Sequence, residues 1–119
     1  MTLLDFTHSL LQSFLLTVAV EALVVLVVAR KIFKKTANEL SAQKLIGVGV
    51  FASFATLPYV WYVLPTLLQP FTLAIAVGEM FAVVVEATFY AGVLPLSRKE
   101  AVLLSVAANA ASYFLGKLI

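Results

Sequence analysis

The sequence predicts an all-α integral membrane protein with four transmembrane helices. Hydrophobic residues make up 63% of its 119 residues and charged residues only 12%, a balance far from that of soluble domains. The apolar residues form long runs, each close to the roughly 20 residues that an α-helix needs to cross a bilayer. Four such segments use most of the chain, so we expect a single domain spanning residues 1–119 without a separate soluble part.

Four apolar segments follow one another along the chain. The first covers about 9–29 and is followed by a basic run at 30–35, which is typical of the end of a transmembrane helix. The others cover about 45–64, 71–94 and 101–119, with only short connections between them. Alternation with a period of two, which marks membrane β-strands, is absent from the sequence. Helices are therefore the expected form of all four segments.

Short motifs mark the starts of three of these helices. In a capping box, a hydroxyl side chain and an acid three residues later bond to each other's backbone N–H groups. Thr36 with Glu39 fits this pattern before the second segment, and Ser97 with Glu100 fits it before the fourth. We expect each box to start its helix. Pro70 suits the first position of the third helix, where its missing N–H is tolerated.

Pro58 lies inside the second segment and is expected to kink that helix. Proline has no backbone N–H, so it removes one hydrogen bond of the helix and leaves a carbonyl without its partner. Ser53 and Thr56 stand nearby, and their hydroxyls could bond to the freed backbone groups.

The basic residues are unevenly distributed between the two sides of the predicted bundle. Seven of the eight Lys and Arg residues fall in the connections 30–44 and 95–100, whereas only Lys117 lies near the other side. The positive-inside rule then places both connections in the cytoplasm and both termini outside, with the plasma membrane as the expected location. Trp61 lies with two tyrosines near the outer end of the second segment, where an aromatic belt is expected.

The two halves of the chain share an ordered series of residues. Each half has an intramembrane Val-Glu-Ala triplet, then a basic pair, a capping box and two polar residues three positions apart. Two helical hairpins of the same orientation would form a parallel repeat. Chance similarity between apolar helices is the alternative interpretation. The triplets are centred on Glu21 and Glu86, and the polar pairs are Ser53 with Thr56 and Asn109 with Ser112.

Acidic residues inside the apolar segments are the strongest functional signal. A carboxylate in hydrocarbon is costly, so such residues usually face a protein interior or a water-filled path. Glu21, Glu86 and Asn109 lie at a similar depth, roughly 13 to 18 Å along their helices from the nearest basic connection. We therefore expect them to converge on one site that binds a substrate or ion. The alternative is a hydrogen-bonded knot that only holds the helices in register.

Several other polar side chains are candidates for the same site. Glu79 and Tyr90 share the helical face of Glu86, with Glu79 about 10 Å further towards the outside. At that separation Glu79 would act as a second station on a path rather than share a proton with Glu86. The remaining candidates are the hydroxyl residues Ser53, Thr56 and Ser112.

The residue inventory excludes several kinds of chemistry. The chain has no cysteine and only one histidine, His8, which rules out thiolate nucleophiles and Cys-ligated or multi-His metal sites within one chain. No hydroxyl at membrane depth has a histidine or lysine to activate it, so we expect no enzyme activity. We expect no cofactor, no metal and no nucleic-acid partner either.

These observations favour a small transporter or channel subunit for protons or a cationic substrate. Four helices enclose little space, so we expect a homo-oligomer or a partner membrane subunit within the lipid bilayer. A non-catalytic structural or assembly subunit of a larger membrane complex is the main alternative. A lipid-binding protein, whose carboxyl groups would line a cleft open to lipid, is the third.

Overall fold

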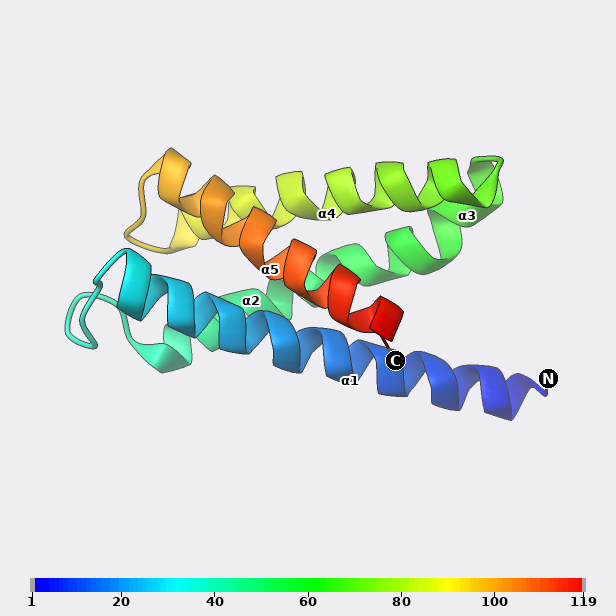
Figure 1. Cartoon of the computed structure of the whole chain (residues 1–119), viewed down its shortest axis with the longest axis horizontal. Helices are drawn as coiled ribbons and strands as arrows, with labels where there is room; N and C mark the ends of the chain where they lie inside the picture. Colours follow the sequence, from blue (N-terminus) through cyan, green and yellow to red (C-terminus); the bar gives the residue numbers. More distant parts are fainter. Residues whose placement is uncertain (1, 119) are drawn as a thin grey trace.

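The computed structural model describes residues 2–118, apart from the side chains at positions 6, 7, 9, 10 and 116–118. The described part is helical almost throughout and contains no strand, which confirms the all-α prediction. Four long helical stretches are joined by short connections (Figure 1). Three of them are long and apolar enough to cross a membrane, and they are the only such helices among the described residues. The chain is therefore a membrane protein.

The first helix starts earlier than the hydropathy pattern predicts. α1 (Leu3–Val27) continues through a π-helical turn, η1 (Val28–Ile32), before the chain leaves the helix. Its start is fixed by a capping box, in which the Asp5 N–H donates to the Thr2 hydroxyl and the Thr2 N–H donates to the Asp5 carboxylate. The helix thus begins before the predicted span, which starts at about residue 9, because a polar cap precedes the apolar run. The part of the helix that is apolar enough to cross a membrane is Leu11–Ile32.

The second long helix is built from three consecutive pieces. These are α2 (Ala42–Pro58), the π-helical turn η2 (Tyr59–Val63) and the single turn α3 (Leu64–Leu67). Pro58 ends α2, and the wider π-helical turn follows it, since proline supplies no N–H for the regular bonding pattern. The expected disturbance at Pro58 thus takes the form of a change in helix type. Together the three pieces form the second candidate span, Ala42–Leu67.

The start of α2 corrects one prediction. Thr36 and Glu39 do form the reciprocal hydrogen bonds of a capping box, but these close a turn rather than begin a helix. The helix begins at Ala42, where the Ser41 hydroxyl accepts a hydrogen bond from the backbone N–H of Lys44. Leu40, which separates the two motifs, is buried in the apolar core, so the chain turns inward there before the helix starts.

The second hairpin consists of two long helices joined by a short connection. α4 (Phe71–Val93) begins directly after Pro70, which is its N-cap rather than its first helical residue. α5 (Arg98–Leu118) begins with the predicted capping box, because the Ser97 N–H donates to the Glu100 carboxylate at 2.9 Å and the Glu100 N–H donates to the Ser97 hydroxyl at 3.1 Å. The predicted end of this segment, at Ile119, lies outside the described residues.

The cap of α5 gives a stability prediction with a defined pH dependence. The hydrogen bond from the Ser97 N–H holds the pKa of the Glu100 carboxyl below its ordinary value of 4.5. A depressed folded-state pKa means that the contribution of Glu100 is present above pH 4.5 and is lost as the pH falls below it. We expect Glu100→Gln to lower the melting temperature in mild detergent at neutral pH, with a shrinking difference in acid. An equal difference at all pH values would contradict this account of the cap.

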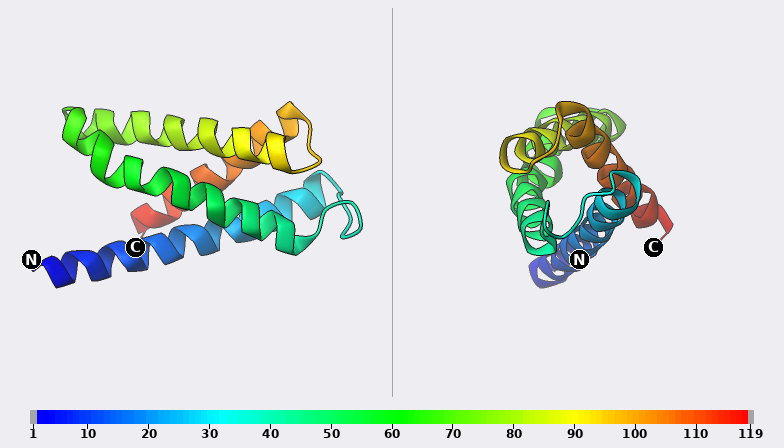
Figure 2. Two further views of the ribbon diagram at one scale, coloured as in Figure 1. Left: turned by 180° about the vertical axis from the view of Figure 1, so that it is seen from behind. Right: turned by 90° about the vertical axis from the view of Figure 1, so that its left-hand side faces the viewer.

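The four long stretches pack as a ring in which each touches two neighbours. α1 packs against α2 and α5, and α4 also packs against α2 and α5. Figures 1 and 2 show α5 crossing the bundle obliquely, so that it closes the ring by reaching α1. The two connections 33–41 and 94–97, which flank the basic residues, lie together at one end, here called the basic end. The N-terminus and the turn between α3 and α4 lie at the opposite end, here called the terminal end.

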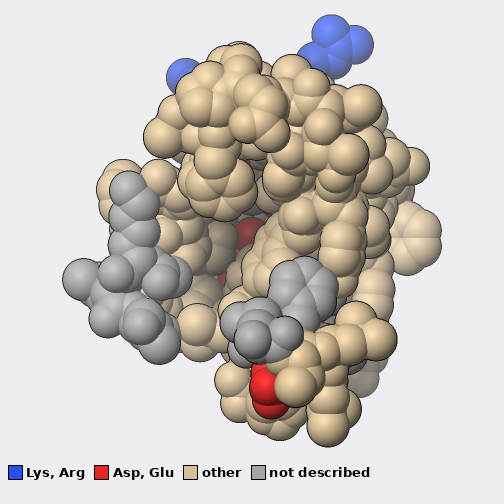
Figure 3. Space-filling view, turned by 90° about the vertical axis from the view of Figure 1, so that its right-hand side faces the viewer, with Lys and Arg blue, Asp and Glu red and all other residues tan. Residues whose placement is uncertain are grey.

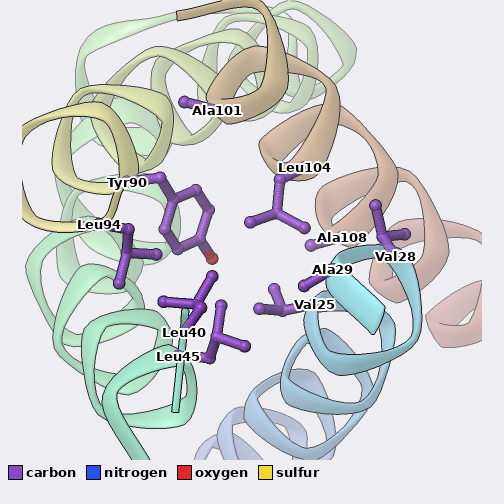
Figure 4. Close-up of a cluster of buried hydrophobic side chains, with 10 residues drawn as sticks. All are labelled: Val25, Val28, Ala29, Leu40, Leu45, Tyr90, Leu94, Ala101, Leu104 and Ala108. Carbon is purple, nitrogen blue, oxygen red and sulfur yellow. The ribbon is translucent and has the colours of Figure 1, made fainter. Parts of the chain in front are cut away.

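An apolar cluster fills the ring near its basic end. Figure 4 shows its side chains converging from the helices and from the connection that follows η1. The Tyr90 ring projects from α4 towards the middle of this cluster. Among the described residues, its hydroxyl is buried and has no hydrogen-bond partner. The cluster consists of Val25, Val28, Ala29, Leu40, Leu45, Tyr90, Leu94, Ala101, Leu104 and Ala108.

The outer surface of the bundle is apolar. Large hydrophobic side chains such as Phe51, Phe54 and Met80 are at least 60% exposed, whereas Ser53, Thr56 and Glu86 on the same helices are buried. This inverted arrangement is expected where lipid, rather than water, surrounds the helices. Small residues allow close packing inside the ring: a Cβ atom added at Gly78 of α4 would lie 3.1 Å from Val60, so α4 and η2 approach closely there.

Candidate functional site

Glu21 is held in the centre of the ring by hydroxyl groups from two other helices. The Ser53 hydroxyl of α2 donates to one of its carboxyl oxygens at 3.0 Å, and the Ser112 hydroxyl of α5 donates to the other at 3.0 Å. The side chain is only 4% exposed. These two bonds position both oxygens of the Glu21 carboxyl and connect α1 with both of its neighbours in the ring.

Glu86 of α4 forms the second polar centre, together with Asn109 of α5. The Asn109 side-chain amide donates to the Glu86 carboxyl and also to the backbone carbonyl of Ser105, at 2.9 Å. Ser105 in turn donates from its hydroxyl to the Val83 carbonyl of α4 at 2.8 Å. Glu86 is 1% exposed, so the bonded pair lies in the interior. The polar stripe of α5 therefore faces the acidic face of α4.

The two centres follow the same pattern within the two halves of the chain. In the first hairpin Glu21 is bonded to Ser53, and in the second hairpin Glu86 is bonded to Asn109. In both cases the acid lies on the first helix of the hairpin and its donor on the second helix. Ser112 joins the halves, because its hydroxyl lies within hydrogen-bonding distance of both Glu21 and the Asn109 carbonyl.

A cavity of about 500 Å³ lies beside these two centres. Its lining comes from α1, α2, η2, α4 and α5, so it lies inside the ring rather than on one of its faces. Figure 3 looks at the terminal end and shows a hollow between the helices with acidic side chains at its floor. The apolar cluster lies on the other side, towards the basic end. The cavity is therefore open at the terminal end and closed at the basic end.

The cavity lining is acidic and polar. Its acids are Glu21, Glu79 and Glu86, and none of its described lining residues is Lys, Arg or His. Glu79 is half-buried, and no hydrogen bond or ion pair engages its carboxyl among the described residues. Glu79 thus lines the cavity without a bond to either of the two polar centres. The neutral polar residues of the lining are Gln12, Ser13, Thr17, Ser53, Thr56, Asn109, Ser112 and Tyr113, with Trp61 among the apolar ones.

The acids of the cavity act on one another. The Glu21 and Glu86 carboxyls are close enough to interact electrostatically, and Glu79 contributes to the field at both. Like charges confined in a poorly hydrated space repel each other strongly. A proton or a cation that enters the cavity would offset this repulsion. No three acidic or histidine side chains of the described residues come together as a group that could hold a metal ion.

Two further predicted site residues differ in their relation to the cavity. Tyr90 shares the face of Glu86, but it does not line the cavity and lies in the apolar cluster that closes it. Thr56 lines the cavity, and its hydroxyl donates to the Ser53 carbonyl at 3.3 Å rather than to a side chain. The Ser53 hydroxyl was considered as a partner for backbone groups near Pro58, and it bonds to Glu21 instead.

Two aromatic residues of the lining were missed as site residues. Trp61 was assigned to an interfacial belt, yet it lines the cavity beside Val60, and Tyr113 of α5 lines it as well. Tyr113 directly follows Ser112, and its position next to the polar stripe of α5 was the available signal. Trp61 gave no such signal, because its place near the outer end of the second segment indicated the membrane interface.

Comparison with known proteins found no matching protein family, no matching curated protein and no matching solved structure. The chemistry of the cavity is thus the basis for assigning a function.

Proposed function

We propose that this protein is a small transporter or channel subunit for protons or a cationic substrate. The observation that carries the proposal is the cavity of about 500 Å³, which opens at the terminal end. Its described lining contains three acids and no basic residue. Transport proteins commonly place ionisable groups in such intramembrane cavities, because a charge there is stable only when it is paired, protonated or hydrated. Glu21 and Glu86 are the exchangeable charges, and Asn109 is a polar ligand beside them.

The proposed topology has four transmembrane helices with α5 as the fourth, and both termini outside. The basic residues that flank the connections at the basic end then lie in the cytoplasm. In this orientation the cavity opens to the outside and the apolar cluster closes it towards the cytoplasm. The two hairpins, with their matching acid and donor pairs, are halves of a parallel repeat.

One-sided access suggests how the cavity works. A substrate enters from the terminal end and displaces protons from the carboxyl groups. It then stays bound in the cavity, because the apolar cluster blocks the way to the cytoplasm. Release to the cytoplasm requires this cluster to separate, which a movement of one hairpin against the other would achieve. Such a movement would change the hydrogen bond from Ser112 to Glu21, which links the two hairpins.

A homo-oligomer is part of the proposal. One chain forms only a single ring of helices, and their outer faces carry many exposed apolar side chains that a second copy could cover. The plasma membrane is the proposed location, and the whole chain acts as a single domain.

Purified protein in sealed vesicles tests the proposed function directly. An imposed pH gradient or a gradient of candidate cations should dissipate faster in vesicles that contain the protein than in protein-free vesicles. A stable homo-oligomer in mild detergent should accompany this activity. Protein that moves neither protons nor cations, and that keeps its fold only with a partner chain, would instead favour a structural or assembly subunit.

A further inference from the structure

A second hollow lies directly outside the acidic cavity. It is an apolar groove of about 480 Å³ between α1 and the helix formed by α2 and η2. Leu57 and Trp61 line both the cavity and the groove, so these two side chains form the wall between them. The remaining lining of the groove is entirely apolar or aromatic: Leu11, Phe14, Leu15, Phe54, Pro58 and Tyr62.

The shared wall lies where two helices separate. α1 packs against α2, whereas η2 packs against α2, α3 and α4 on the far side of the ring. Figure 2 shows α1 diverging from the α2–η2–α3 stretch towards the terminal end. Side chains rather than packed backbones therefore separate the cavity from the groove. Between α1 and α2, the ring centroids of Phe14 and Phe54 lie 4.7 Å apart. The groove opens on the outer face, where exposed apolar side chains indicate lipid.

The two hollows complement the two parts of one kind of molecule. The cavity supplies negative charge together with the aromatic rings of Trp61 and Tyr113, a combination that binds organic ammonium groups. The groove supplies an apolar surface for a hydrocarbon chain. Each hollow has a volume in the range of about 300 to 1,000 Å³ that is typical of sites for small organic ligands.

The acids do not suit a bare metal ion as well. A metal ion requires several ligands at close and regular distances. Among the described residues, no three His, Asp or Glu side chains form a group that could hold one. An organic ammonium ion instead spreads its charge over a larger surface and can be held by carboxyls and rings that stand further apart. Glu79, whose carboxyl has no partner among the described residues, is available for this contact.

We propose that the substrate is an amphipathic organic cation, whose ammonium head binds in the cavity beside Glu79 and whose hydrocarbon tail passes Trp61 into the groove. This inference rests on the proposed function, since it names the substrate class of the same cavity. The head enters the cavity from the terminal end, and the tail lies in the groove between α1 and η2, on the lipid-facing side. Phe14 and Phe54 select for the tail, and Glu79 makes the first contact with the head.

Equilibrium binding of alkyltrimethylammonium ions to the protein in lipid nanodiscs tests this inference. Hexyltrimethylammonium should bind at least about tenfold more tightly than tetramethylammonium, after subtraction of uptake by empty nanodiscs, because the longer chain buries several additional CH₂ groups. Glu79→Gln should weaken the binding of both ions. Phe54→Ala should weaken only the binding of hexyltrimethylammonium. Tyr62 lines the groove but not the cavity, so Tyr62→Ala is a second variant with the same expected effect.

Phe51→Ala is the matched control, because Phe51 lies on the same helix and is exposed, yet lines neither hollow. Equal affinity for the two ions, or tail-dependent binding that survives both groove substitutions, would overturn the inference. These outcomes are separate from failure of the proposed function. If the protein moves protons in vesicles but shows no tail-dependent binding, the proposed function holds and the inference about the substrate is overturned. If it shows tail-dependent binding but no flux, the binding site is supported and the transport role is overturned.

Discussion

Glu86→Gln is expected to reduce proton or cation flux through the reconstituted protein to the level of protein-free vesicles. Glutamine has nearly the same shape and keeps an oxygen that can accept from Asn109, so the contact between α4 and α5 persists. It cannot carry a charge or exchange a proton, which is the property that the proposed function requires. The measurement is the decay of an imposed pH or cation gradient in sealed vesicles that contain equal amounts of folded protein.

Glu100→Gln is the matched control for this prediction. Its carboxyl caps α5 at the basic end and lies far along the helix from Asn109, so its removal leaves the cavity unchanged. Glu21→Gln should behave like Glu86→Gln, because its carboxyl also lines the cavity. Parent-level flux in both cavity variants would show that these two carboxyls only hold helices together.

Leu104→Ser is expected to make the reconstituted protein passively permeable to protons. Leu104 is fully buried in the apolar cluster that closes the cavity towards the basic end, and narrow apolar constrictions stop ions by excluding water. Serine is shorter and polar, so water would enter the space and connect the cavity with the cytoplasmic side. We expect protons to pass passively in both directions and the folded state to lose about 2 to 5 kcal/mol, as for other buried leucine truncations.

Leu103→Ser provides the comparison for this variant. Leu103 is the neighbouring residue of α5 and is 49% exposed, so its replacement does not touch the cluster. Leu45→Ser tests the same cluster from α2, which matters if Leu104→Ser fails to fold. Passive proton permeability that stays at the parent level in a folded cluster variant would contradict the view that these side chains close the path.

The sequence indicated one of the buried polar contacts. Glu79 and Glu86 share one face of α4, and the polar stripe of α5 has the same depth, so helical periodicity alone brought Glu86 to Asn109. The links from Glu21 to Ser53 and Ser112 were not predicted, because the comparison of the two halves matched these residues by order and not by contact. Periodicity works here because intramembrane polar groups must face the interior, which leaves few possible arrangements.

Other features could not be predicted because they depend on how whole helices are placed. The cavity exists where α1 separates from η2, and no local pattern encodes that angle. Trp61 lies in a π-helical turn, which hydropathy does not reveal, and from there it lines the cavity. The position of α2 depended on Ser41 rather than on the more conspicuous pair Thr36 and Glu39, since burial of Leu40 decided where the chain turns.

The central claim is that Glu21 and Glu86 exchange protons or cations with the outside through the cavity. Infrared difference spectroscopy of the membrane-embedded protein tests it most directly, because protonated and ionised carboxyl groups absorb at different frequencies. A step in external pH or in hexyltrimethylammonium concentration should change the carboxyl bands, and Glu21→Gln and Glu86→Gln should each remove part of that change. Bands that are the same before and after both steps would contradict the claim and identify the two carboxyls as a sealed packing contact.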